Sequence, residues 1–100
     1  MKILLRSALF ALAALPLTAT ADSILVLDAS GSMWGQVKGK PKVEIAREAV
    51  ATMLKTWPAD ESLGLIAYGH RRKGDCADIE AVSAPKLLDK AAFQQRVNSL

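Results

Sequence analysis

Three oxygen-bearing side chains occupy alternate positions early in the chain, at Asp28, Ser30 and Ser32. One carboxylate and two hydroxyls are all hard donors, which favour cations such as Mg²⁺, Mn²⁺ or Ca²⁺ over soft metals. Gly31 lets the turn between the serines adopt backbone conformations that are closed to other residues. The competing interpretation is that both serines only cap a turn, as serine does in many loops. The residues around the motif distinguish between a metal site and a turn cap.

The residues before and after this motif favour the metal interpretation. An apolar run over 23–27 precedes Asp28, and it is typical of a central parallel strand that is buried on both faces. Open α/β sheets bind ligands at the carboxyl ends of their strands, which is where Asp28 would lie. Residues 29–40 carry three glycines and no apolar periodicity, so they are predicted to form a loop. The motif therefore sits at a strand end, in the position that a ligand-binding loop needs.

The rest of the chain predicts alternating helices and strands. Apolar residues recur at spacings of three and four over 42–56, which predicts an amphipathic helix with Pro41 as its first residue. A second apolar strand is expected over 62–68 and a short edge strand over 79–82, before Pro85 breaks the chain. Asp89 can cap a last helix in which Ala92, Phe93 and Val97 share a face. This order predicts an α/β fold with a mainly parallel sheet.

The residues 24–33, Ile-Leu-Val-Leu-Asp-Ala-Ser-Gly-Ser-Met, resemble the opening of a von Willebrand factor type A (VWA) domain. The run over 63–69 resembles the second strand of that family, and the segments 34–35, 39–42 and 68–72 resemble an exported bacterial branch of it. The similarity extends from about Ile24 to Val97. It implies a doubly wound, Rossmann-like, mainly parallel sheet whose upper edge holds a metal-ion-dependent adhesion site (MIDAS).

The resemblance also implies roles for individual residues. Asp28, Ser30 and Ser32 match the first ligand loop of the family, with the serines as direct ligands and Asp28 binding directly or through water. The family completes its site with a threonine and an aspartate from two further loops, and neither can be assigned, because Thr52 and Thr56 fall in the predicted helix. Three donors do not fill the roughly six oxygen positions of a hard cation, so weak binding of Mg²⁺, Mn²⁺ or Ca²⁺ is expected.

Two functions remain open at this point. The first is a non-enzymatic adhesion module that binds a protein in a divalent-cation-dependent manner, with an acidic side chain of the partner completing the metal sphere. The second is a truncated or purely structural fragment without a complete metal site. The segment 22–100 would in either case be the N-terminal part of a VWA domain, and a single cysteine, Cys76, would be a free thiol or half of a disulfide.

The N-terminal residues predict export. Lys2 and Arg6 precede a short apolar stretch, and small residues at 19 and 21 form an exit site, so residues 1–21 are expected to be a Sec-type signal peptide cleaved after Ala21. The apolar stretch is too short for a membrane anchor, which needs about 20 residues, so no membrane span is expected after cleavage. The chain has 13 Lys and Arg against 10 Asp and Glu, and removing Lys2 and Arg6 leaves 11 against 10. The protein is therefore expected in the periplasm or outside the cell, with no nucleic-acid partner.

No catalytic residue is predicted. An aspartate nucleophile of the phosphotransferase kind would need a second carboxylate where Ser30 stands, and a serine hydrolase would need a Gly-x-Ser-x-Gly elbow, which the sequence around Ser32 lacks. Trp34 is expected to pack and close the loop, or else to be a contact for the partner. The basic run over 70–73 is expected to be a solvated hairpin tip, or else a binding surface for an acidic partner.

Overall fold

The computed structural model describes residues 22–100. Its elements, in chain order, are β1 Asp22–Asp28, the 3₁₀ helix η1 Gly31–Trp34, β2 Gln36–Val37, β3 Lys40–Pro41, α1 Lys42–Lys55, β4 Ser62–Tyr68, β5 Ile79–Leu87 and α2 Lys90–Asn98. The predicted signal peptide, residues 1–21, lies outside the described residues. Both long strands of the sequence prediction and both helices are present.

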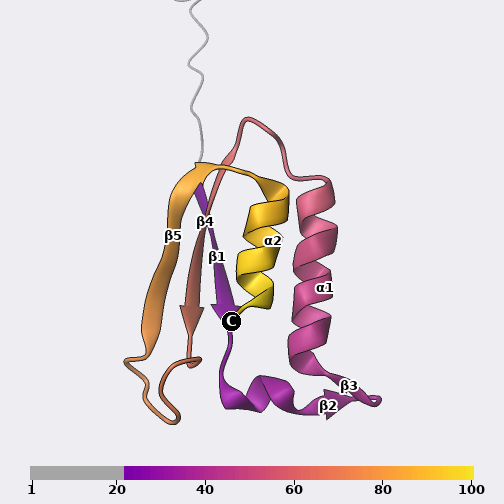
Figure 1. Cartoon of the computed structure of the whole chain (residues 1–100), viewed down its shortest axis with the longest axis vertical. Coiled ribbons are helices and arrows are strands. Elements are labelled where there is room, and N and C mark those ends of the chain that lie inside the picture. The colour runs from indigo at the N-terminus through magenta and orange to yellow at the C-terminus, as the bar shows by residue number, and fades with distance from the viewer. Residues whose placement is uncertain (1–21) are drawn as a thin grey trace, which may run out of the picture.

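A three-stranded sheet forms the centre of the fold, in the order β1-β4-β5 (Figure 1). β4 runs parallel to β1, with Asp28 opposite Tyr68 at the carboxyl ends of the two strands. β5 runs antiparallel to β4 and brings Ile79 opposite Tyr68. The carboxyl ends of β1 and β4 and the start of β5 therefore lie at one edge of the sheet, and this edge carries the predicted ligand loop.

The expectation of a doubly wound, mainly parallel sheet is wrong. The sheet is mixed, with one parallel and one antiparallel pair. The reason is the connection between β4 and β5, which runs from Gly69 to Asp78 and contains no helix. A parallel neighbour needs a crossover of about a dozen residues or more, usually through a helix, whereas a shorter loop turns the chain back on itself.

Both helices pack on the same face of the sheet. Val50 and Leu54 of α1 and Phe93 and Val97 of α2 form a buried cluster with Leu63 and Leu65 of β4. Leu25 and Leu27 of β1 pack against this cluster from the sheet side. Asp89 caps α2 as predicted, because its side chain accepts a hydrogen bond from the backbone amide of Ala92 at 3.1 Å. The apolar periodicity thus identified Val50, Leu54, Phe93 and Val97 as buried, whereas Ala49 and Ala92, which were expected on the same faces, are exposed.

The opposite face of the sheet is open, so the prediction that β1 is buried on both faces is wrong. Ile24 and Val26 are 52% and 60% exposed, while their neighbours Leu25 and Leu27 face the helices. Ile79 continues the open face on β5 and is 59% exposed. A continuous apolar run does not reveal which side of a strand lacks a covering helix, and this explains the error.

The edge strand β5 is longer than predicted and runs through Pro85. A Cβ atom on Gly64 of β4 would lie 2.9 Å from the backbone nitrogen of Pro85 and 2.9 Å from the carbonyl oxygen of Ser83. The missing side chain at Gly64 therefore gives β5 room to pass, and the strand pairing is irregular on both sides of Leu65. Proline is tolerated in an edge strand at such an irregularity, because its nitrogen need not donate to a neighbour.

The loop predicted over 29–40 contains η1 and a small hairpin formed by β2 and β3. Lys38 and Gly39 make the turn of this hairpin, both with positive φ. Pro41 ends β3 and stands directly before α1, so the helix begins at Lys42, one residue later than predicted. Within residues 22–100, no helix combines the length and apolar character that crossing a membrane requires.

Candidate metal centre

The three predicted donors converge at the end of β1. The Ser30 hydroxyl donates to Asp28 Oδ1 at 2.6 Å, and the Ser30 backbone amide donates to the same oxygen at 2.9 Å. Ser32 Oγ lies 3.0 Å from Ser30 Oγ. Since the single hydroxyl proton of Ser30 goes to Asp28, Ser32 is the donor in the pair of serines. The Ser30 proton thus points to Asp28 and the Ser32 proton to Ser30, which leaves lone pairs on both oxygens for another ligand.

Backbone contacts hold this loop against the neighbouring strand. The Ala29 amide donates to the Tyr68 carbonyl at 3.0 Å, which extends the pairing of β1 and β4 by one residue. Ser30 then turns the chain into η1, where the Met33 amide donates to the Ser30 carbonyl at 3.0 Å. Ser32 lies in the first turn of η1, so its hydroxyl returns toward Ser30.

Gly69 permits the close approach between this loop and the end of β4. Its φ of +77° lies in the left-handed region, and a Cβ atom there would be 2.7 Å from Ser30 Cβ. Both the backbone conformation and the lack of space call for glycine. The sequence shows a glycine directly after the second strand, but not that it abuts the ligand loop.

The electrostatics of the site favour an ionised carboxylate. The hydrogen bond from the Ser30 hydroxyl, and then that from the Ser30 amide, lower the pKa of Asp28 below its usual value, against the opposing effect of burial. The Tyr68 hydroxyl and the charge of Lys42 lower it further. Burial raises the pKa of Tyr68, and the negative charge of Asp28 adds to that shift. Asp28 is therefore a carboxylate and Tyr68 a neutral phenol at neutral pH.

The spacing of the donors fits a small hard cation. Two ligands at about 2.1 Å from Mg²⁺ and at right angles to each other lie roughly 3.0 Å apart. The two serine oxygens are 3.0 Å apart, which matches the separation of two neighbouring ligands of one such ion. Asp28 accepts the hydroxyl proton of Ser30 and lies next to the pair of serines. Thr52 does not contribute, because its hydroxyl donates to the Glu48 carbonyl within α1.

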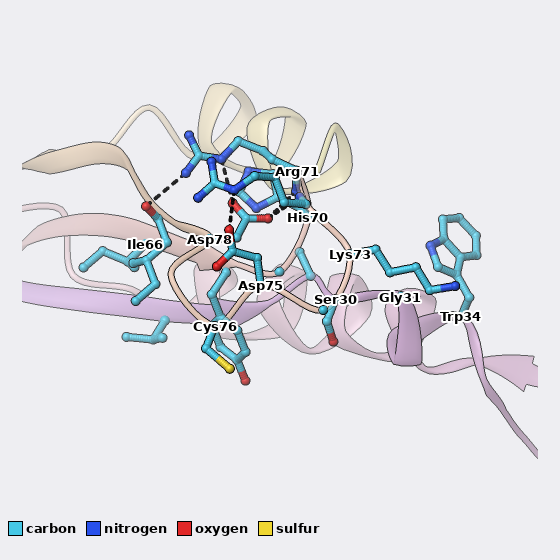
Figure 2. Close-up of a pocket in the computed structure, with 17 residues that line it drawn as sticks. Ser30, Gly31, Trp34, Ile66, His70, Arg71, Lys73, Asp75, Cys76 and Asp78 are labelled. Carbon is cyan, nitrogen blue, oxygen red and sulfur yellow. Dashed lines mark hydrogen bonds and ion pairs between the residues drawn. The ribbon is translucent and has the colours of Figure 1, made fainter.

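A second loop, which runs from Gly69 to Asp78, stands beside the ligand loop and is built around a residue that the sequence analysis missed. Asp78 is only 1% exposed, and its carboxylate accepts from the backbone amides of Arg71 and Arg72, each at 2.6 Å, and from Arg71 Nε at 2.8 Å (Figure 2). Burial raises the pKa of Asp78, but the hydrogen bonds from Arg71 and Arg72 outweigh it and bring the pKa to about 2. The only signal in the sequence is an aspartate that follows two arginines by a few residues.

The remaining candidates have the following environments. Trp34 is 63% exposed, so it does not pack to close the loop, and its alternative role as a partner contact stays a prediction. The basic residues do lie in the turn between two antiparallel strands, as expected for a hairpin tip. Within this turn Arg71 is paired with Asp78 and Glu80, and His70 contacts Glu80 at 3.2 Å. Cys76 is an exposed free thiol in the described structure.

No group of three or more His, Cys, Asp or Glu side chains is placed to hold a metal ion within residues 22–100. The candidate centre is of a different kind, because two of its three donors are serine hydroxyls. In comparisons with known proteins, no protein-family model and no curated protein matches the chain. The resemblance to the VWA family therefore rests on the motif and its flanking residues.

Proposed function

We propose that this chain is a non-enzymatic protein-binding module of the VWA kind, which binds its partner through a hard divalent cation held by Asp28, Ser30 and Ser32. The observation that carries the proposal is the 3.0 Å separation of the two serine oxygens in front of an ionised aspartate. A cation held there would offer an open coordination position to a carboxylate of another protein. Magnesium is the first candidate, with manganese and calcium as alternatives.

The position of the site suits contact with another protein. The donors lie at the carboxyl ends of β1 and β4, and Ser32 and the neighbouring Trp34 are exposed. A single carboxylate leaves a divalent cation with excess positive charge, so an acidic side chain of the partner can complete both the charge and the coordination. Residues 1–21 have the features of a signal peptide, and the proposed location is the periplasm or the exterior of the cell.

Titration of the purified, ¹⁵N-labelled protein with Mn²⁺ tests this proposal. Paramagnetic broadening is expected first at the amides of Ser30, Gly31 and Ser32, and at millimolar or submillimolar concentration, since the chain supplies three of about six ligands. Asp28→Ala should abolish the local broadening. Asp22→Ala is the matched control, because Asp22 lies at the other end of the same strand.

The experiment has a clear negative result. Broadening that is equal in both variants, or that centres on the acidic residues of other loops, would overturn the assignment of Asp28. If no broadening occurs with millimolar Mn²⁺ at a tenfold excess over the protein, the result would instead support the second interpretation, a fragment without a competent metal site. Competition by Mg²⁺ and Ca²⁺ against the Mn²⁺ signal then ranks the cations.

A further inference from the structure

A groove with a volume of about 700 Å³ lies next to the candidate metal centre. Its floor is the open face of the sheet near the strand ends, formed by Val26, Ile66, Tyr68 and Ile79. Val26 is 60% and Ile79 59% exposed, so the floor offers apolar surface to a ligand. One wall is the ligand loop with Ser30 and the other is the loop from Gly69 to Asp78, and Figure 2 shows both around the same space.

The second wall is held in a fixed shape. The buried carboxylate of Asp78 accepts three hydrogen bonds from Arg71 and Arg72, and the Gly69 amide donates to the Asp78 carbonyl at 2.8 Å. These hydrogen bonds hold the two ends of the loop together where β4 ends and β5 begins. A ligand would therefore meet a preformed wall, which reduces the ordering cost of binding.

The charges of this wall are paired except for one. Arg71 is compensated by Asp78 and Glu80, and Arg72 Nε contacts Asp75 at 2.7 Å. Lys73 has no acidic partner among the ion pairs of residues 22–100. Figure 2 shows its side chain extending from the wall toward Trp34, on the side of Gly31 and the ligand loop. An uncompensated ammonium group thus lies on the ligand-loop side of the groove, near the candidate metal centre.

We infer that this groove docks an extended segment of a partner protein in which an acidic residue adjoins a large apolar residue. The apolar side chain packs on the floor that Val26, Ile66, Tyr68 and Ile79 form, and the acidic side chain lies between Lys73 and the ligand loop. This inference deepens the proposed function and rests on it for the identity of the partner as a protein. The apolar floor argues against a nucleic acid or a small anion, whose charged groups would gain nothing from such a surface.

Three capped dipeptides separate the contributions. N-acetyl-Asp-Leu-amide, N-acetyl-Asn-Leu-amide and N-acetyl-Asp-Gly-amide are titrated into the ¹⁵N-labelled protein, once with Mg²⁺ and once with EDTA, and amide shifts are followed. The Asp-Leu peptide should bind at millimolar concentration and shift residues of the groove. Loss of the leucine side chain should weaken binding roughly tenfold. Loss of the charge should weaken it as well, and more strongly when Mg²⁺ is present.

Matched variants locate the peptide on the protein. Val26→Ser should weaken binding of the Asp-Leu peptide severalfold, whereas Ile24→Ser should not, because Ile24 lies on the same face of β1 but outside the groove. Lys73→Gln should weaken the Asp peptides roughly twofold to fivefold and leave the Asn peptide unchanged. Lys86→Gln, at the opposite end of the sheet, is the charge control.

The outcomes distinguish this inference from the proposed function. Mn²⁺ broadening at Ser30 without any difference between Val26→Ser and Ile24→Ser would overturn the groove and leave the metal site standing. Leucine-dependent binding in EDTA without Mn²⁺ broadening would support the groove and overturn the metal site. Equal binding of the Asn-Leu and Asp-Leu peptides would overturn the role of Lys73. Binding to phosphatidylglycerol vesicles that depends on Lys73, with no peptide binding, would overturn the protein partner in favour of a lipid surface.

Discussion

Replacing Gly69 by alanine should disturb the candidate metal centre without touching any of its donors. Gly69 has a φ of +77°, and a Cβ atom there would lie 2.7 Å from Ser30 Cβ and 3.0 Å from Ser30 Cα. Carbon atoms pack favourably at about 3.5–4.0 Å, so Ser30 has to move by roughly 1 Å. This shift would separate the Ser30 hydroxyl from Asp28 or from Ser32.

The expected loss of stability in Gly69→Ala has two causes. The left-handed backbone costs a residue with a Cβ atom about 1–2 kcal/mol, partly offset by the lower entropy of the unfolded chain. Steric overlap in a packed site typically costs about 1–3 kcal/mol more. The free energy of unfolding should therefore fall by about 2–4 kcal/mol. In a domain of this size, each kcal/mol corresponds to roughly 4–8 °C in Tm.

Gly74 provides a matched control for the first cause. Its φ is +72°, close to that of Gly69, but a Cβ atom there would meet nothing within 4 Å. Gly74→Ala should thus show the backbone cost alone, about 1 kcal/mol, and should keep the Mn²⁺ response of the native protein. Thermal unfolding followed by circular dichroism, together with the Mn²⁺ titration, measures both quantities in the same samples.

A particular result would refute this reasoning. If Gly69→Ala and Gly74→Ala lower Tm by the same amount, then the new Cβ atom at residue 69 has no steric cost, because the loop around Ser30 moves without loss of stability. If Gly69→Ala lowers Tm further but leaves the Mn²⁺ response unchanged, then the position of Ser30 does not determine cation binding.

Three further predictions concern the frame around the site. Asp78 has a pKa of about 2 against an ordinary value of 3.8, so its contribution to stability is present above pH 3.8 and is lost as the pH falls through 2. Denaturant titrations between pH 5 and 2 should therefore show a decline in the free energy of unfolding, and Asp78→Asn should reduce that decline. Leu65→Ala removes a side chain that is 0% exposed, at the centre of β4, and should lower the free energy of unfolding by about 2–5 kcal/mol in urea titrations. Asp89→Ala removes the cap of α2 and should cost about 1 kcal/mol in the same assay, whereas Asp60→Ala, in a turn with no such contact, should be neutral within about 0.5 kcal/mol.

The local elements could be predicted from the sequence because their signals are local. The helix over 42–55 and the strand over 62–68 follow from apolar spacing, and the cap at Asp89 follows from residue type. The orientation of β5 depends instead on what connects it to β4. The ten-residue connection has no helical pattern and is too short for a parallel crossover, but Pro85 indicates a strand that ends before the residues that pair with the start of β4. Proline excludes a residue from the centre of a regular sheet, not from an edge strand that faces a glycine.

The candidate site divides in the same way. The spacing of Asp28, Ser30 and Ser32 identified donors that the structure does bring together. The sequence did not predict that Asp78 holds the second loop together. Its neighbours Ala77 and Ile79 do not indicate that it is buried, and its burial depends on the contacts with Arg71 and Arg72 in the folded loop. The sequence did not predict the open sheet face either. The residues around Val26 are as apolar as those of a strand that is covered on both faces, yet Val26 is exposed.

Gly69 is the residue that joins the two halves of the site. Its Cα is closely approached by Ser30, on the ligand loop, and its amide donates to the Asp78 carbonyl, which closes the second loop. The wall that carries Lys73 and the loop that carries the serines are therefore set against each other through one residue at the end of β4. A cation held by the serine loop would attract the acidic side chain of the peptide, so metal and peptide should each bind more tightly in the presence of the other. If the affinity for the Asp-Leu peptide is the same with Mg²⁺ and with EDTA, then the two loops act independently and this coupling is absent.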